Sequence, residues 1–129
     1  MRVLTTSETD RPRTARAFAN PSQLVVVSLC AAWCDTCDAF RSAYERLAIA
    51  RPAIAFVWLD IEDDAALCGD VDVENFPTLA IYRGREPVHF GVSLPTEAVV
   101  GRMIDTLAAS AAPLAAPPDA VAKLPEAFG

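Results

Sequence analysis

Two cysteines separated by two residues are the clearest chemical feature of this 129-residue chain, in the order Trp33-Cys34-Asp35-Thr36-Cys37. They follow a β-branched run that predicts a buried strand, and they open a segment whose apolar residues recur at helical spacing. A helix start favours negative charge, because its backbone N–H groups are unpaired and the positive end of the helix dipole lies there. Cys34 is therefore predicted to be a nucleophilic thiolate. Cys37, one turn deeper, is predicted to attack the mixed disulfide that forms at Cys34.

Cys30 and Cys68 are the remaining cysteines. Free cysteine is among the most buried residue types, so both are interpreted first as small packed hydrophobes. The alternative is a metal or iron–sulfur site built from Cys30, Cys34 and Cys37, with Cys68 as a candidate fourth ligand. Structural zinc sites usually pair their ligands at short spacing on both sides, and the second pair is absent here. We therefore expect no metal ion and no other cofactor.

Strands and helices alternate in the elements that would position these cysteines. Strands are predicted at Leu24–Ala32, Ala53–Leu59, Thr78–Tyr82 and Val88–Val92, with a weak edge strand or a disordered start in residues 1–10. Helices are predicted at Arg11–Asn20, Cys34–Ala50, Asp63–Asp72 and from Pro95 through Leu107, the last with either Thr96 as its N-cap or Pro95 at its first position. This order predicts an α/β sandwich.

The last nineteen residues differ in composition from the rest. They are rich in Ala and Pro, which predicts one domain over residues 1–110 and a flexible extension over residues 111–129. The apolar residues Leu114, Val121, Leu124 and Phe128 leave room for this extension to pack on the domain or on a neighbour.

Net charge and the lack of targeting segments exclude several classes of protein. The formal charge is −6, and residues 60–74 carry seven acidic side chains and no basic one, which argues against a nucleic-acid partner. The longest apolar run, Leu24 to Cys34, is shorter than the roughly 20 residues of a membrane span, so no membrane partner is expected. Residues 1–23 fit neither a secretory signal nor a transit peptide, which predicts a cytoplasmic protein with reduced cysteines.

A second motif, Phe76-Pro77-Thr78, precedes a predicted strand, and together the two motifs resemble the thioredoxin superfamily over about residues 3 to 110. The resemblance implies a three-layer sandwich with a central mixed sheet flanked by helices. It also implies a cis peptide bond at Phe76–Pro77, and substrate binding by Trp33, Phe76, Pro77 and Thr78. The implied activity is protein-disulfide reduction, with protein disulfides as substrates, an upstream thiol reductase as electron donor, and a monomer or weak dimer as the assembly.

The chain departs from thioredoxins proper at several positions. Asp35-Thr36 stands between the cysteines in place of Gly-Pro, and Ser28 and Trp58 stand where a buried Asp and a Lys are usual. Asp60, on the same strand face as Trp58, is a possible substitute proton acceptor, with water or the Cys34 thiolate as the alternatives. Glu62 occupies the place of an acid that supports the active-site tryptophan. These departures keep a second interpretation open, namely a thioredoxin-like binding module with slow or no turnover.

Overall fold

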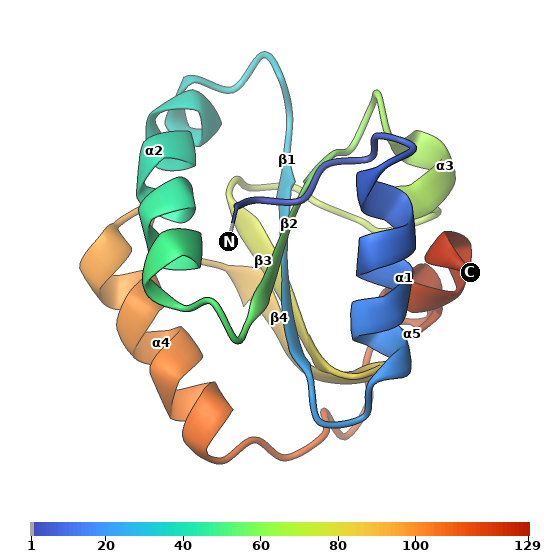
Figure 1. The fold of residues 1–129 in the computed structure, drawn as a ribbon. Coiled ribbons are helices and arrows are strands. Elements are labelled where there is room, and N and C mark those ends of the chain that lie inside the picture. Colours follow the sequence, from blue (N-terminus) through green and yellow to red (C-terminus); the bar gives the residue numbers. More distant parts are fainter. Residues whose placement is uncertain (1) are drawn as a thin grey trace.

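A four-stranded sheet forms the centre of the molecule in a computed structural model that describes residues 2–129 (Figure 1). Its strands are β1 (Leu24–Cys30), β2 (Ala55–Asp60), β3 (Thr78–Arg83) and β4 (Glu86–Val92), in the spatial order β2-β1-β3-β4. β1 runs parallel to β2 and antiparallel to β3, and β3 runs antiparallel to β4. Helices cover both faces of this mixed sheet, which confirms the predicted α/β three-layer sandwich.

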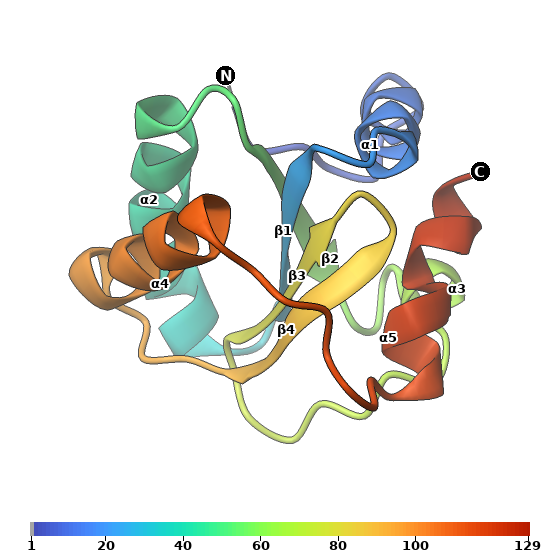
Figure 2. The same cartoon turned by 90° about the horizontal axis from the view of Figure 1, so that it is seen from below.

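The helices divide between the two faces, as Figures 1 and 2 both show. One face carries α2 (Asp35–Ala50) and α4 (Glu97–Ala109), and the other carries α1 (Asp10–Ala19), α3 (Ala65–Cys68), α5 (Asp119–Lys123) and the 3₁₀ helix η1 (Leu124–Phe128). Each face of the sheet therefore covers its own apolar core. Within the described residues, 2–129, no helix has both the length and the apolar character that crossing a membrane requires.

Strand β1 occupies the middle of the sheet because it is apolar on both faces. All seven of its residues are buried. Side chains alternate along a strand, so Val25, Val27 and Leu29 enter the core under α1, while Val26 enters the core under α2. Cys30, the last residue of β1, is 2% exposed and shares the face of Val26. Cys30 thus lies at the C-terminal end of a central strand, on the side of α2.

The N-terminal segment adds one bridge to the edge of β2 rather than a full strand. The Leu4 N–H donates to the Phe56 carbonyl at 2.7 Å, and the Trp58 N–H donates to the Leu4 carbonyl at 3.0 Å. The buried carboxylate of Asp10 anchors this segment by pairing with the Arg2 guanidinium and by accepting from the backbone N–H and the hydroxyl of Thr5. The predicted weak edge strand is therefore a single bridge with a polar anchor.

The C-terminal extension, expected to be flexible, is packed over its second half. It crosses the β4 edge, where the Leu114 N–H donates to the Pro87 carbonyl at 2.9 Å, and reaches the face that carries α1 (Figure 2). There Val121 is fully buried, and its carbonyl accepts the Tyr82 hydroxyl at 2.7 Å. The Phe128 ring lies 5.7 Å from the Phe18 ring. Apolar residues spaced through a Pro-rich segment are enough to dock it.

Two predicted helix boundaries are settled by local hydrogen bonds and backbone conformation. Thr96 is the N-cap of α4, because its hydroxyl accepts from the Val99 N–H. The helix predicted over Asp63–Asp72 is only the four residues of α3. Gly69 ends it with a positive φ of 60°, a conformation that glycine adopts at little cost.

Candidate active site

Cys34 is the N-cap residue of α2, as the motif predicted. Its backbone is extended, its N–H donates to the Ala31 carbonyl at 3.0 Å, and its carbonyl accepts the first helical bond from Asp38 at 3.1 Å. Cys37 lies in the first turn, three residues on. The Cys34 side chain is half-buried, whereas Cys37 is 1% exposed. Cys34 is therefore the cysteine of this turn that a substrate can reach.

Cys37 is disulfide-bonded to Cys30, and Cys34 is a free thiol. The Cα atoms of Cys30 and Cys37 are 6.0 Å apart, well within the usual range for a disulfide. The sequence predicted Cys34 and Cys37 as the redox pair and Cys30 as a packed hydrophobe. The Cys30–Cys37 disulfide differs from that expectation. The reason is geometric, because the first turn of α2 directs Cys37 into the core, where β1 ends at Cys30. Strand alternation could have signalled this, since it places Cys30 on the side of α2.

Ser28 and Asp60 are the polar neighbours of this buried disulfide. The Ser28 hydroxyl is fully buried and lies 3.6 Å from the Cys30 sulfur. It is the donor of that contact, because a disulfide sulfur carries no proton. Asp60 is the residue of β2 directly opposite Cys30 in the parallel register. One oxygen of its carboxylate accepts from the backbone N–H groups of Glu62 and Asp63, at 2.8 and 2.9 Å.

An aromatic pair links the Cys34 turn to the loop that carries Pro77. Trp33 is 65% exposed, and its ring makes an edge-to-face contact with the Phe76 ring, with centroids 5.4 Å apart. The Trp33 indole N–H donates to the Glu62 carboxylate at 2.5 Å, which is the support that the resemblance implied for Glu62. The two motifs therefore meet in space, although about forty residues separate them in the sequence.

The Phe76–Pro77 peptide bond is cis, which confirms the expectation from the resemblance. Pro77 is buried, and its carbonyl accepts from the Ser93 N–H at 3.1 Å. Over residues 2–129, the N–H and carbonyl groups of Phe76 make no hydrogen bond, so they are free to pair with an extended peptide. Thr78 has a different environment from the one expected of a substrate-binding side chain. It is 5% exposed, and its hydroxyl donates to the Asn75 carbonyl at 2.6 Å.

Exposed carboxylates lie on both segments that carry the aromatic pair. We call them the acidic rim: Asp35, Asp38, Asp72 and Glu74. The guanidinium of Arg41 lies 4.8 Å from the centre of the Trp58 ring and pairs with Glu45, so its positive charge is already engaged outside the acidic rim. The apolar contact of Trp33 with Phe76 therefore has a charged border, which is the usual arrangement of a small protein-docking site.

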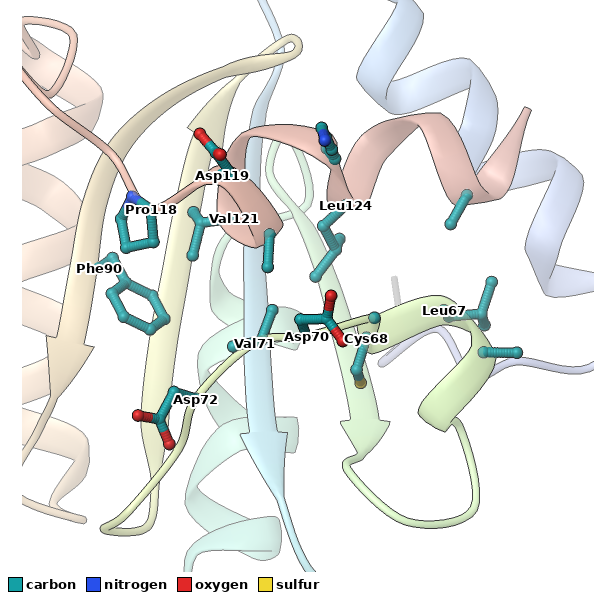
Figure 3. Close-up of a pocket in the computed structure, with 15 residues that line it drawn as sticks. Leu67, Cys68, Asp70, Val71, Asp72, Phe90, Pro118, Asp119, Val121 and Leu124 are labelled. Carbon is teal, nitrogen blue, oxygen red and sulfur yellow. The ribbon is translucent and has the colours of Figure 1, made fainter.

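Cys68 lies on the other face of the sheet, away from the disulfide. It is 3% exposed, and burial, reinforced by Asp64 and Asp60, raises the pKa of its thiol to about 11. A hollow of about 740 Å³ opens between its helix and α5, lined in part by Val71, Phe90 and Leu124 (Figure 3). None of the predicted catalytic or substrate-binding residues lines it, although Asp72 of the acidic rim borders it. Cys68 is thus a packed residue with little thiolate character.

The described residues, 2–129, contain no cluster of three or more His, Cys, Asp or Glu side chains with the geometry of a metal site. Two of the four cysteines considered as ligands are bonded to each other, and Cys68 is in the opposite core. The metal alternative thus lacks a ligand set in this part of the chain.

A mixed sheet with a Cys-x-x-Cys turn beside a cis-proline loop defines the thioredoxin fold class. The Thioredoxin family model matches residues 7–104, and the chain belongs to this family. A thioredoxin-like protein CXXS1 from Oryza sativa subsp. japonica is 32% identical over 80% of this chain and 76% of the relative. A protein disulfide-isomerase from Aspergillus oryzae is 35% identical over 70% of this chain, which spans only 18% of that relative. A poplar thioredoxin h mutant has the same fold, with a TM-score of 0.72 and 17% identity, over 92% of this chain and 88% of that structure.

Proposed function

We propose that the protein is a thiol–disulfide oxidoreductase that reduces disulfide bonds in protein substrates. The observation that carries the proposal is the position of Cys34, an accessible thiol at the start of α2 beside the Trp33–Phe76 contact. Membership of the Thioredoxin family supports the class of reaction. The curated relatives that support it include both thioredoxins and protein disulfide-isomerases.

The reaction begins when an extended substrate segment pairs with the free backbone groups of Phe76 and packs on Trp33. The Cys34 thiolate attacks one sulfur of the substrate disulfide, which releases the first substrate thiolate and leaves a mixed disulfide at Cys34. The Cys37 thiolate then attacks the Cys34 sulfur and releases the second substrate thiolate. The substrate gains two electrons, and the protein is left with a Cys34–Cys37 disulfide. Asp60 is the proposed acceptor of the Cys37 proton, and solvent water is the alternative.

The remaining cycle requires a donor of electrons, and we propose an upstream thiol reductase for that role. One protein of the same fold, a thioredoxin f2, has been solved in complex with ferredoxin:thioredoxin reductase, with a TM-score of 0.66 to this chain. We propose a reducing cytoplasm as the compartment, because a reductase cycle needs a surrounding redox potential that keeps dithiols reduced. We propose a monomer or weak dimer, since the core on each sheet face is covered by the chain's own helices.

The test is insulin reduction with dithiothreitol as donor. Wild type should accelerate it, Cys34→Ser should abolish the acceleration, and Cys37→Ser should accumulate mixed disulfides with the substrate that mass spectrometry identifies. Cys68→Ser is the matched control, because it removes a cysteine from the opposite core and should leave the rate unchanged. A Cys34→Ser variant that kept most of its activity would refute the assignment.

A second candidate, a binding module with slow turnover, is favoured by one observation. Cys37 is occupied by Cys30, which leaves Cys34 without its resolving partner. Such a module would form stable mixed disulfides at Cys34 even in the wild-type protein. Rapid release of the reduced substrate from wild type, but not from Cys37→Ser, would exclude it.

A further inference from the structure

We propose that Cys30 is a third redox-active cysteine, which takes the disulfide over from Cys34 after turnover and stores it inside the protein. The proposal rests on the proposed function, since the substrate disulfide oxidises the Cys34–Cys37 pair in the first place. It assigns a chemical role to a strand residue outside the Cys-x-x-Cys motif.

Cys37 is placed to bond either of two cysteines. From α2 it bonds down to Cys30, whose Cα lies 6.0 Å away at the end of β1. Along the helix, Cys34 is the N-cap residue and Cys37 is the third helical residue. Side chains at these two helix positions meet, as they do when they cap each other's backbone N–H groups. The Cys37 sulfur therefore has one partner on β1 and a second at the start of its own helix, so that disulfide exchange requires only a change of partner at Cys37.

The exchange step conserves atoms and electrons. The Cys30 thiolate attacks the Cys37 sulfur, the Cys30–Cys37 bond forms, and the Cys34–Cys37 bond breaks with its electron pair leaving on Cys34. The proton that Cys30 gives up to become a thiolate is balanced by one that Cys34 takes from solvent. No external oxidant or reductant takes part, because the protein contains one disulfide before and after the step.

Burial and local charge favour the exchanged form. In the Cys34–Cys37 form the free sulfur is Cys30, which is 2% exposed, with the neutral Ser28 hydroxyl beside it and Asp60 opposite it on β2. A thiolate there is poorly solvated. In the Cys30–Cys37 form the free sulfur is Cys34, which reaches solvent at a helix N-terminus, where negative charge is favoured. The disulfide then lies between residues that are 2% and 1% exposed.

This arrangement separates the stored disulfide from external thiols. A small thiol cannot approach Cys30 or Cys37 directly, whereas Cys34 remains accessible. Reduction must therefore start when the Cys34 thiolate attacks Cys37 and restores the Cys34–Cys37 bond at the surface. The oxidised protein would thus present a free, reactive thiol at the site where an ordinary dithiol oxidoreductase presents a disulfide.

The experiment measures that thiol in the native oxidised protein. Cys68→Ser serves as the background, so that Cys68 contributes no signal. The reduced protein is oxidised by one equivalent of a peptide disulfide, separated from it, and treated with a maleimide without denaturant. The proposal expects one maleimide per protein, bound at Cys34. The same treatment of Cys30→Ser in this background should give none, because Cys34 and Cys37 are then bonded to each other.

Differential alkylation locates the disulfide. After the maleimide step the protein is denatured, reduced and alkylated with iodoacetamide. Cys30, Cys34 and Cys37 fall on one tryptic peptide between Arg16 and Arg41, so fragment ions assign each label. The expected product carries maleimide on Cys34 and carbamidomethyl on Cys30 and Cys37.

A parallel sample is treated with maleimide again after denaturation but before reduction. Maleimide on Cys30 in that sample, with none taken up by the native protein, would overturn the proposal, because it means that the disulfide stays at Cys34–Cys37. Cys30→Ala provides a second variant if Cys30→Ser folds poorly, and circular dichroism checks both. The proposed function fails independently, in insulin reduction. Turnover that depends on Cys34 together with a Cys34–Cys37 resting disulfide would refute only the storage role of Cys30.

Discussion

Leu124→Ala tests whether the C-terminal extension is part of the folded domain. Leu124 lies in η1, is 2% exposed, and belongs to the same apolar core as Phe18 and Tyr82. Removing three side-chain carbons at this position reduces the buried apolar surface and the van der Waals contacts within the core. If the segment docks as the structure shows, unfolding should therefore become easier by a measurable amount.

The magnitude follows from what surrounds the side chain. Leu→Ala changes in cores cost about 2 to 5 kcal/mol, and the upper part of that range reflects a sealed cavity that cannot relax. Leu124 also borders the hollow beside α5, as Figure 3 shows, so the space it leaves is open to water. We therefore expect a loss of about 2 to 3 kcal/mol in the free energy of unfolding.

Urea unfolding of the reduced protein, followed by circular dichroism, measures this loss. Glu126→Ala is the matched control, because Glu126 is an exposed residue of the same 3₁₀ helix and its side chain makes no hydrogen bond or ion pair within residues 2–129. It should change the free energy by less than about 0.5 kcal/mol. Equal stabilities for the two variants would show that the segment does not dock, and the reasoning from burial would be refuted. Insulin reduction should be unaffected, since the segment lies across the sheet from Cys37.

Three further predictions concern charge. Asp10→Asn should lower the free energy of unfolding by about 1 kcal/mol at neutral pH. The hydrogen bond from Arg2 holds the pKa of Asp10 well below its ordinary value, so the stabilisation by the carboxylate is lost only as the folded protein protonates it. The difference in stability between the variant and wild type should therefore shrink as pH falls below about 4, which urea titrations at several pH values would measure. Asp60→Asn keeps an oxygen that can accept from the N–H groups of Glu62 and Asp63 but removes the proposed base. It should slow formation of the Cys34–Cys37 disulfide by about 100-fold, as measured by stopped-flow fluorescence. An unchanged rate would leave water as the proton acceptor. Because of the acidic rim, peptide disulfides flanked by Lys should be reduced about tenfold faster at low salt than matched peptides flanked by acidic residues. This preference should be lost at about 1 M salt, where charges are screened. Equal rates for the two peptides at low salt would contradict the prediction.

Most of the fold could be predicted because its main elements have strong and consistent patterns. The β-branched run in β1 is long enough to indicate burial on both faces, and the spacing in α2 and α4 is plainly helical. The short helix α3 was overestimated because a polar, acidic stretch contains little periodicity to limit it. The docking of residues 111–129 could not be derived, since Ala/Pro composition favours flexibility and only the tertiary contacts of Val121 and Leu124 outweigh it.

The candidate site was predictable where a motif carries its own local structure. Cys34 at the N-cap and Cys37 in the first turn follow from a strand–turn–helix order that the sequence displays. The meeting of Trp33 with Phe76 came from the resemblance, because no local pattern brings two loops together. The partner of Cys37 was missed for a different reason. Burial of a cysteine is typical of inert packing, but it is also typical of a cysteine that lies opposite a redox partner.

The departures from thioredoxins proper are mutually consistent once Cys30 is included. Ser28 stands where those proteins bury an Asp, two residues from Cys30 and on the same strand face. A buried carboxylate at that position would oppose a thiolate at Cys30, because like charges repel strongly where solvent is excluded. A neutral hydroxyl 3.6 Å from the sulfur can instead donate to it. Asp60, beside Cys30 in the register but half-exposed, keeps a carboxylate near the site without burying one. Ser28→Asp should therefore slow the transfer of the disulfide from Cys34–Cys37 to Cys30–Cys37, which the same alkylation experiment would detect in samples taken at successive times after oxidation.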